Sequence, residues 1–182
     1  MAVLLDAPTR AALAEAAARL RAAAGALPVS WTAADNYHVT VKFLGNVDGG
    51  RVDEIAAALR DAARGHAPFT LVVGGLGAFP SALRPRVLWA GITAGGEAVT
   101  SVAGAVDAGL ARLGLPREAR DFSPHVTIGR VRESRRVPAL VEALDGNGEF
   151  GRVAVDAVTL MRSELSPRGA RYTPLASAPL GG

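Results

Sequence analysis

The sequence predicts an α+β fold with two related lobes that face each other across a cleft. Helix-spaced apolar residues alternate along the chain with short runs rich in β-branched residues. One four-residue pattern, His-apolar-Thr-apolar, begins at His38 and occurs again at His125. Each copy lies in a predicted strand that is followed by a helix, so we expect a duplicated unit with one sheet in each lobe.

The strand prediction depends on β-branched and apolar runs that end at turn-forming residues. Gly45, for example, ends the run that contains the first motif. The predicted strands, in chain order, span residues 1–5, 29–32, 37–44, 69–76, 87–93, 122–131, 153–165 and 170–175.

The helix prediction depends on apolar spacing and on start and stop residues. Pro8 is tolerated in the first turn of the first helix, and Gly25, Gly65 and Gly114 end the first three. The predicted helices span residues 6–24, 52–63, 99–113 and 138–144. Glycine, proline or charge dominates the remaining connections. The predicted loops and turns cover residues 33–36, 77–86, 115–121, 132–136 and the hairpin turn 166–169.

Composition limits the class of protein. A length of 182 residues with 49% hydrophobic residues fits one domain, residues 1–182, built of two lobes around a packed core. The chain has no cysteine, which excludes disulfides, thiolate metal sites and a cysteine nucleophile. No apolar run reaches the roughly 18 residues of a membrane helix, so we expect a cytoplasmic protein without a membrane partner.

The charged residues permit a nucleic-acid partner without demanding one. The net charge is +3 and Lys42 is the only lysine, so nearly all the basic residues are arginines. A bias toward GC-rich codons accounts for many of them, although the planar guanidinium also suits phosphate.

The paired motifs carry the chemistry. Alternation along a strand places His38 with Thr40, and His125 with Thr127, on one face. Two imidazoles at one cleft can remove a proton from water and give one to a leaving oxygen, while threonine hydroxyls bind phosphate oxygens. Lys42 continues the register of the first motif and is a further candidate for phosphate binding.

Arg130 is the remaining candidate for phosphate binding. Strict alternation places it on the face opposite His125, so this role needs a twist or bulge near Gly129. The alternative for three of these candidates is that they are ordinary strand residues without a functional role: Thr40, Thr127 and Lys42.

Two further alternatives concern metal binding and the third histidine. A metal would need a third ligand besides two histidines, and neither Asp35 nor Asp121 shares a register with its motif. Chemistry without metal or other cofactor is therefore the simpler prediction. His66 has no such motif around it and is expected to be a solvated loop residue.

The motif blocks resemble those of the 2H phosphoesterase superfamily, and within it the bacterial RNA 2′,3′-cyclic phosphodiesterases, long called 2′-5′ RNA ligases. The resemblance rests on residues 34–45, 122–130, 162–165 and 172–175 and extends over nearly the whole chain. It implies a bilobal α+β fold with two pseudo-symmetric antiparallel sheets flanking a central cleft and helices outside. It also implies a shortened first strand, because family members usually begin several residues earlier.

The resemblance further implies metal-free hydrolysis of a terminal 2′,3′-cyclic phosphate to a 2′-phosphate, with reversible 2′-5′ ligation in vitro. It makes His125 the base, His38 the acid, and Thr40, Thr127 and Arg130 the phosphate ligands. The expected partners are RNA ends, including tRNA fragments, bound by a monomer. The alternatives are a non-catalytic nucleotide- or RNA-binding module of the same fold and a phosphodiesterase for a small cyclic nucleotide.

Overall fold

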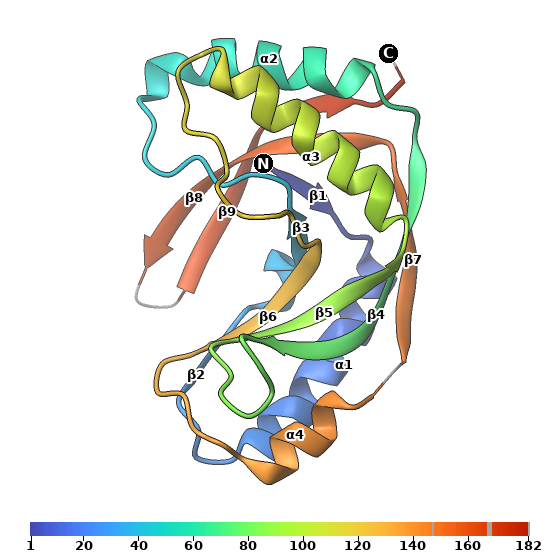
Figure 1. The fold of residues 1–182 in the computed structure, drawn as a ribbon, viewed down its shortest axis with the longest axis vertical. Helices are drawn as coiled ribbons and strands as arrows, with labels where there is room; N and C mark the ends of the chain where they lie inside the picture. Colours follow the sequence, from blue (N-terminus) through green and yellow to red (C-terminus); the bar gives the residue numbers. More distant parts are fainter. Residues whose placement is uncertain (147, 167–168, 182) are drawn as a thin grey trace.

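The fold is one strongly curled antiparallel sheet with helices on its outer side (Figure 1). The structure is a computed structural model and describes residues 1–146, 148–166 and 169–181. Within these residues nine strands form the order β7-β4-β5-β6-β3-β1-β8-β9, with β2 added beside β6. The strands are β1 Ala2–Leu4, β2 Val29–Trp31, β3 His38–Thr40, β4 Phe69–Phe79, β5 Val87–Ala94, β6 His125–Val131, β7 Glu149–Val155, β8 Ala157–Ser166 and β9 Gly169–Pro179.

The helices follow the predicted apolar spacing and cover the two ends of the curled sheet. They are α1 Ala7–Ala24, α2 Val52–Arg64, α3 Gly96–Ala111 and α4 Pro138–Leu144, with short 3₁₀ turns at Ala34–Asn36 and Gly49–Arg51. The Asp6 carboxylate caps α1 by accepting a hydrogen bond from the Thr9 amide at 2.9 Å. Helices α1 and α4 pack together beside β7 and β4, whereas α2 packs with α3 and with β8 and β9 (Figure 1).

The α+β class with two halves is confirmed, and each half carries one motif strand. Strands β2, β4, β5, β6 and β7 form one half, and β1, β3, β8 and β9 form the other. The structure differs from two separate sheets in that β3 and β6 are hydrogen-bonded neighbours, with Val39 opposite Val126. The two halves therefore meet at the motifs themselves.

Glycine explains why β4 continues beyond the predicted end at residue 76. Gly77 pairs with Trp89 of β5, and a Cβ on Gly77 would lie 2.3 Å from Trp89 Cζ2. The residue therefore makes room for an indole ring on an extended strand, whereas the sequence suggested a loop. The loop begins only after Phe79.

Other boundaries differ from the prediction at bends in the backbone. Strand β3 ends at Thr40, where the amides of Val41 and Lys42 both bond to the Met1 carbonyl, as in a β-bulge. The predicted strand 153–165 is divided at Asp156 into β7 and β8. Of the predicted hairpin turn, Pro167 and Arg168 lie outside the described residues.

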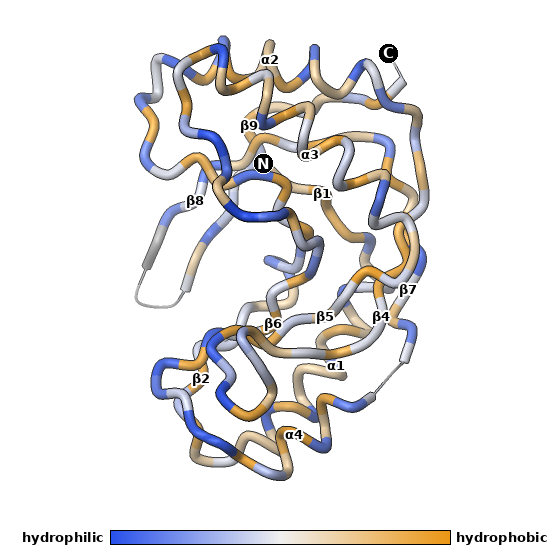
Figure 2. Tube along the Cα trace, viewed as in Figure 1, coloured by the Kyte–Doolittle hydropathy of each residue, from blue (hydrophilic) through white to orange (hydrophobic). Residues whose placement is uncertain are grey.

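The core runs continuously through both halves. Val39, Val126 and Ile128 are fully buried in it, as the alternation of the motif strands predicts. The tube view shows apolar segments in both halves and hydrophilic stretches at several connecting loops (Figure 2). No helix in the described part of the chain is long and apolar enough to span a membrane.

Candidate active site

The four motif side chains gather on one face at the junction of the two halves. Because β3 and β6 pair antiparallel at Val39 and Val126, His38 lies beside Thr127, and Thr40 lies beside His125. The buried valines point to the core, so the His and Thr side chains point to the opposite, concave face. The two motifs thus meet on neighbouring strands of one sheet, whereas the sequence led us to expect them to face each other across a cleft between two sheets.

Both imidazoles are oriented by a backbone carbonyl two residues earlier. His38 Nδ1 lies 2.8 Å from the Asn36 carbonyl oxygen, and His125 Nδ1 lies 2.7 Å from that of Ser123. A carbonyl oxygen can only accept, so each Nδ1 carries the proton and donates it. Each neutral ring therefore has its basic atom at Nε2, where it can exchange a proton with a bound molecule.

His38 is the more tightly held of the two histidines. Its Nε2 lies 3.1 Å from Thr40 Oγ1, and in the Nδ1-protonated ring it accepts the threonine hydroxyl proton. Burial lowers the pKa of His38, and the hydrogen bond to Asn36 opposes this only partly. In the free protein His38 is thus neutral at pH 7.

An aromatic ring packs against each histidine, which the sequence analysis did not predict. Tyr172 of β9 meets His38 edge-to-face at 5.0 Å between ring centroids, and Phe79 of β4 meets His125 at 5.2 Å. These rings limit the rotation of the imidazoles. Tyr172 lies in the C-terminal block that suggested the family, but no strand spacing links either ring to a motif.

The structure brings Arg130 to the same face as Thr127 by a bulge. Trp89 of β5 pairs with Thr127 while the preceding Leu88 pairs with Gly129, so Ile128 is an extra residue in β6. Ile128 and Gly129 are both buried, and the exposed Arg130 returns to the concave face. The twist or bulge required by the sequence argument is therefore present.

Arg130 and three motif residues line a small pocket of about 80 Å³. Its lining residues come from β3, β6 and β9, from the turn before β3 and from the position after β2; they are Thr32, Asn36, His38, Thr40, Thr127, Arg130 and Tyr172. His125 lies beside Thr40 just outside this set. In the described chain the Arg130 guanidinium has no carboxylate partner, so it is available for an anion.

The structure does not bring Lys42 into this pocket. After the bulge at the end of β3 its side chain turns inward, and Lys42 is only 7% exposed. Its ammonium donates to Asp107 of α3 and, at 2.8 Å, to the carbonyl of Pro116. The hydrogen bond from Lys42 lowers the pKa of Asp107. Lys42 therefore joins the first motif to α3, because β3 ends before the register reaches it.

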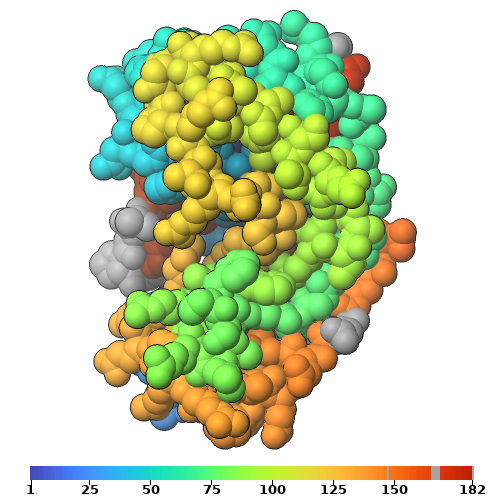
Figure 3. Space-filling view, in the orientation of Figure 1, coloured from blue at the N-terminus to red at the C-terminus, as the bar shows by residue number. Residues whose placement is uncertain are grey.

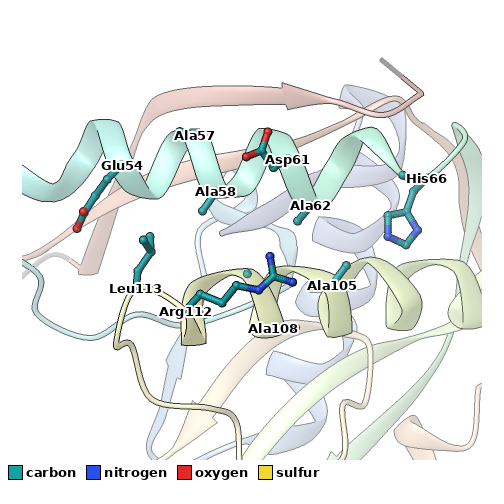
Figure 4. Close-up of a pocket in the computed structure, with 12 residues that line it drawn as sticks. Glu54, Ala57, Ala58, Asp61, Ala62, His66, Ala105, Ala108, Arg112 and Leu113 are labelled. Atoms are coloured by element: carbon teal, nitrogen blue, oxygen red, sulfur yellow. The ribbon is translucent and has the colours of Figure 1, made fainter.

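A larger pocket of about 630 Å³ lies elsewhere, between α2 and α3 (Figure 4). Small residues such as Ala58, Ala62 and Ala105 line much of it, with Arg112 along its wall and His66 at one end. Neither motif contributes to it, so its volume does not make it the catalytic site. In the described chain no three His, Asp or Glu side chains gather as a metal site would require.

The concave face is open to solvent. In the space-filling view the surface is hollowed between the two halves, and blue atoms of the N-terminal quarter are visible at the bottom of the hollow (Figure 3). Thr40, a motif residue of this quarter, is exposed, whereas its neighbour Val39 is fully buried. A phosphate group can therefore reach the motif side chains from this side.

Comparison with known proteins identifies relatives over nearly the whole length. RNA 2′,3′-cyclic phosphodiesterase of Methanothermobacter thermautotrophicus is 36% identical over 147 residues, which cover 80% of this chain and 79% of the relative. The protein of that name from Thermus thermophilus is 32% identical over 188 residues, covering 100% of this chain and 89% of the relative.

Solved structures agree with the sequence comparison. The Thermus thermophilus protein TT0787 superposes with a TM-score of 0.81 at 32% identity, covering 100% of this chain and 96% of that one. Escherichia coli LigT complexed with 3′-AMP has a TM-score of 0.78 at 27% identity and the same coverage. The family model described as LigT-like phosphoesterase matches residues 3–89 and 92–172. This chain belongs to the LigT-like phosphoesterase family.

Proposed function

We propose that this chain is an RNA 2′,3′-cyclic phosphodiesterase that opens a terminal cyclic phosphate to a 2′-phosphate. One observation carries the proposal: His38 and His125 lie on one concave face, each with Nδ1 donating to a carbonyl, so that Nε2 is the atom of each ring that can exchange a proton. A general acid and a general base at one phosphorus are what hydrolysis of a phosphodiester needs. The printed names of the relatives supply the substrate class.

In the proposed reaction, water attacks phosphorus as His125 Nε2 takes one of its protons. The new P–O bond forms while the bond from phosphorus to O3′ breaks, and His38 Nε2 gives its proton to the departing O3′. The products are a 2′-phosphate and a 3′-hydroxyl, and the two imidazoles have exchanged protonation states. The same attack by a 5′-hydroxyl in place of water, with the same departure of O3′, would give the 2′-5′ ligation expected of the family, and its reversal would close the cyclic phosphate again.

This assignment requires His38 to gain a proton when the substrate binds. Burial lowers its pKa in the free protein, so it starts neutral. A cyclic phosphate carries a negative charge, and placing that charge near His38 raises its pKa. We therefore propose that binding of the substrate is coupled to uptake of a proton at His38.

The remaining pocket residues would hold the phosphate. Thr127 lies beside His38, and Thr40 lies beside His125, so both hydroxyls can donate to the non-bridging oxygens. Arg130, which has no carboxylate partner in the described chain, would neutralise the charge that these oxygens gather. Lys42 has no part in this proposal because Asp107 and Pro116 hold its ammonium.

The proposal includes a single two-lobed domain that acts as a cytoplasmic monomer without a metal cofactor. The test is to incubate the protein, in excess chelator, with an RNA ending in 2′,3′-cyclic phosphate. A 2′-phosphate product is expected, and loss of activity in chelator that a divalent ion restores would contradict the two-imidazole mechanism. Binding of the RNA without turnover would instead favour the non-catalytic module, and turnover of cyclic mononucleotides alone would favour the small-nucleotide alternative.

A further inference from the structure

We infer that Arg132, supported by Ser30, forms a second phosphate position one nucleotide upstream of the cyclic phosphate. This inference rests on the proposed function and narrows its substrate class to oligoribonucleotides. A cyclic mononucleotide with a free 5′-hydroxyl has no phosphate that could reach this position.

The strand register places these residues on the pocket face. Ser30 of β2 lies directly opposite Arg130 of β6, so the two side chains point to the same side of the sheet. Thr32, two residues further along the chain from Ser30, also lines the pocket. Ser30 and Thr32 thus form a polar strip along β2 that extends the pocket.

A hydrogen bond to Ser30 holds the exposed Arg132 side chain beside this strip. Its Nε donates to Ser30 Oγ at 3.1 Å, and its amide donates to the Pro28 carbonyl at 3.0 Å, which continues the β2–β6 ladder. The guanidinium therefore lies on the same side as Arg130. One of its five N–H groups binds Ser30, and in the described chain it pairs with no carboxylate.

The spacing fits successive phosphates of one strand. Two residues of an extended chain advance about 7 Å, which is comparable with the step between neighbouring phosphates of an extended RNA. With the cyclic phosphate at Arg130, the 5′ phosphodiester of the terminal nucleotide would lie near Arg132. A planar guanidinium held by one hydrogen bond can present its remaining donors to two phosphate oxygens.

The test compares a 2′,3′-cyclic mononucleotide with a dinucleotide that ends in 2′,3′-cyclic phosphate. We expect Arg132→Ala to lower the ratio of the two kcat/KM values, dinucleotide over mononucleotide, by about 2–5-fold, the worth of one exposed ion pair. The salt dependence of dinucleotide binding should also weaken by about one unit in log–log slope. The control is Arg152→Ala, which removes an exposed arginine of β7 that pairs with Glu149. This variant should leave the ratio unchanged.

A substrate variant separates the phosphate contact from any base contact. Replacing the internal phosphodiester with a neutral methylphosphonate should reduce the wild-type ratio to that of Arg132→Ala and have little further effect on the variant. An unchanged ratio in Arg132→Ala, or an equal loss on both substrates, would overturn the inference while leaving the proposed function intact. A wild-type protein inactive on both substrates would instead contradict the proposed function.

Discussion

The two motif strands share one residue pattern but differ in what surrounds them. In β3, burial keeps His38 neutral, and its two ring nitrogens contact Asn36 and Thr40. In β6, His125 has the same carbonyl contact, but in the described chain no hydrogen bond links its Nε2 to Thr127. A repeated sequence motif therefore does not imply repeated surroundings, because burial lowers the pKa of His38 and, in the described chain, only His38 contacts the threonine of its own motif through Nε2.

The bulges that follow the motifs add a second difference. After Thr40 the bulge turns Lys42 into the interior toward Asp107, whereas after Thr127 the bulge directs Arg130 into the phosphate pocket. One cation thus supports the fold and the other is available to a ligand. The comparison predicts that substitution of Lys42 lowers mainly the stability of the protein, whereas substitution of Arg130 lowers mainly its activity.

The largest expected effect is loss of either imidazole. His38→Ala and His125→Ala should each lower kcat by about 10²–10⁴-fold, the usual worth of a general acid or base. The double variant should lose little more than the worse single one, because the two groups act as a unit. Single-turnover rates on a cyclic-phosphate RNA measure this, with urea unfolding midpoints as the folding control. Losses below tenfold would contradict the two-histidine mechanism.

Removal of the buried cation should mainly affect stability. Lys42→Met removes the ion pair, but Asp107 is partly exposed and keeps a hydrogen bond from the Glu118 amide, so the cost in the free energy of unfolding should be about 1–3 kcal/mol. Because Lys42 lowers the pKa of Asp107, the pair stabilises above the unfolded carboxyl pKa of 3.8 and is lost as the pH falls below it. Urea unfolding between pH 2 and pH 5 should show a larger loss of stability toward low pH in the wild type than in Lys42→Met, where only the Glu118 amide and Arg117 still lower the pKa of Asp107. Equal pH dependence in both would contradict it.

Removal of the pocket cation should mainly affect activity. Arg130→Ala should lower kcat/KM by about 10–100-fold, the worth of a hydrogen bond to a charged group, with no more than a small change in stability. Arg130→Lys should recover part of the loss, since an ammonium supplies the charge without the fork. Arg152→Ala is the matched control on another strand. An effect of Arg130→Ala no larger than that of Arg152→Ala would make Arg130 only a surface residue.

The aromatic neighbours should give the smallest effects. Tyr172→Ala and Phe79→Ala each remove an edge-to-face contact worth about 0.5–1.5 kcal/mol and should lower kcat about 2–10-fold by loosening one imidazole. Tyr172→Phe keeps the ring and should retain most of the activity. A loss in Tyr172→Phe as large as in Tyr172→Ala would show that the hydroxyl, rather than the ring, matters.

The sequence predicted those parts of the structure that follow from local periodicity. The four helices, the presence of a strand at each motif, and the shared face of the His and the Thr within each motif follow from spacing alone. The pairing of β3 with β6, which brings both motifs to one face, does not. The sequence showed only that a phosphate-binding role for Arg130 requires a twist or bulge near Gly129. It could not show that the bulge exists, because alternation in a strand gives no sign of an extra residue. The family resemblance supported Arg130, and the structure supplied the geometry that accounts for it.

Contacts between distant segments could not be predicted from the sequence. The prediction for Lys42 was wrong because it assumed that the first motif strand continues to residue 44. In the structure β3 ends at Thr40, where a bulge against Met1 breaks the alternation of side chains. The packing of Tyr172 against His38 joins residues 134 positions apart in the sequence. Such contacts are set by tertiary packing, which single-strand patterns do not encode.

The most direct test of the difference between the two motifs uses a phosphodiester whose aryloxide leaving group needs no proton. If His38 is the acid and His125 the base, this substrate should restore most of the activity of His38→Ala and none of that of His125→Ala. In the wild type, the same substrate should remove the limb of the pH–rate profile that reports the acid. Restoration of His125→Ala instead would reverse the two roles, and equal restoration of both variants would contradict the claim that the two motifs differ.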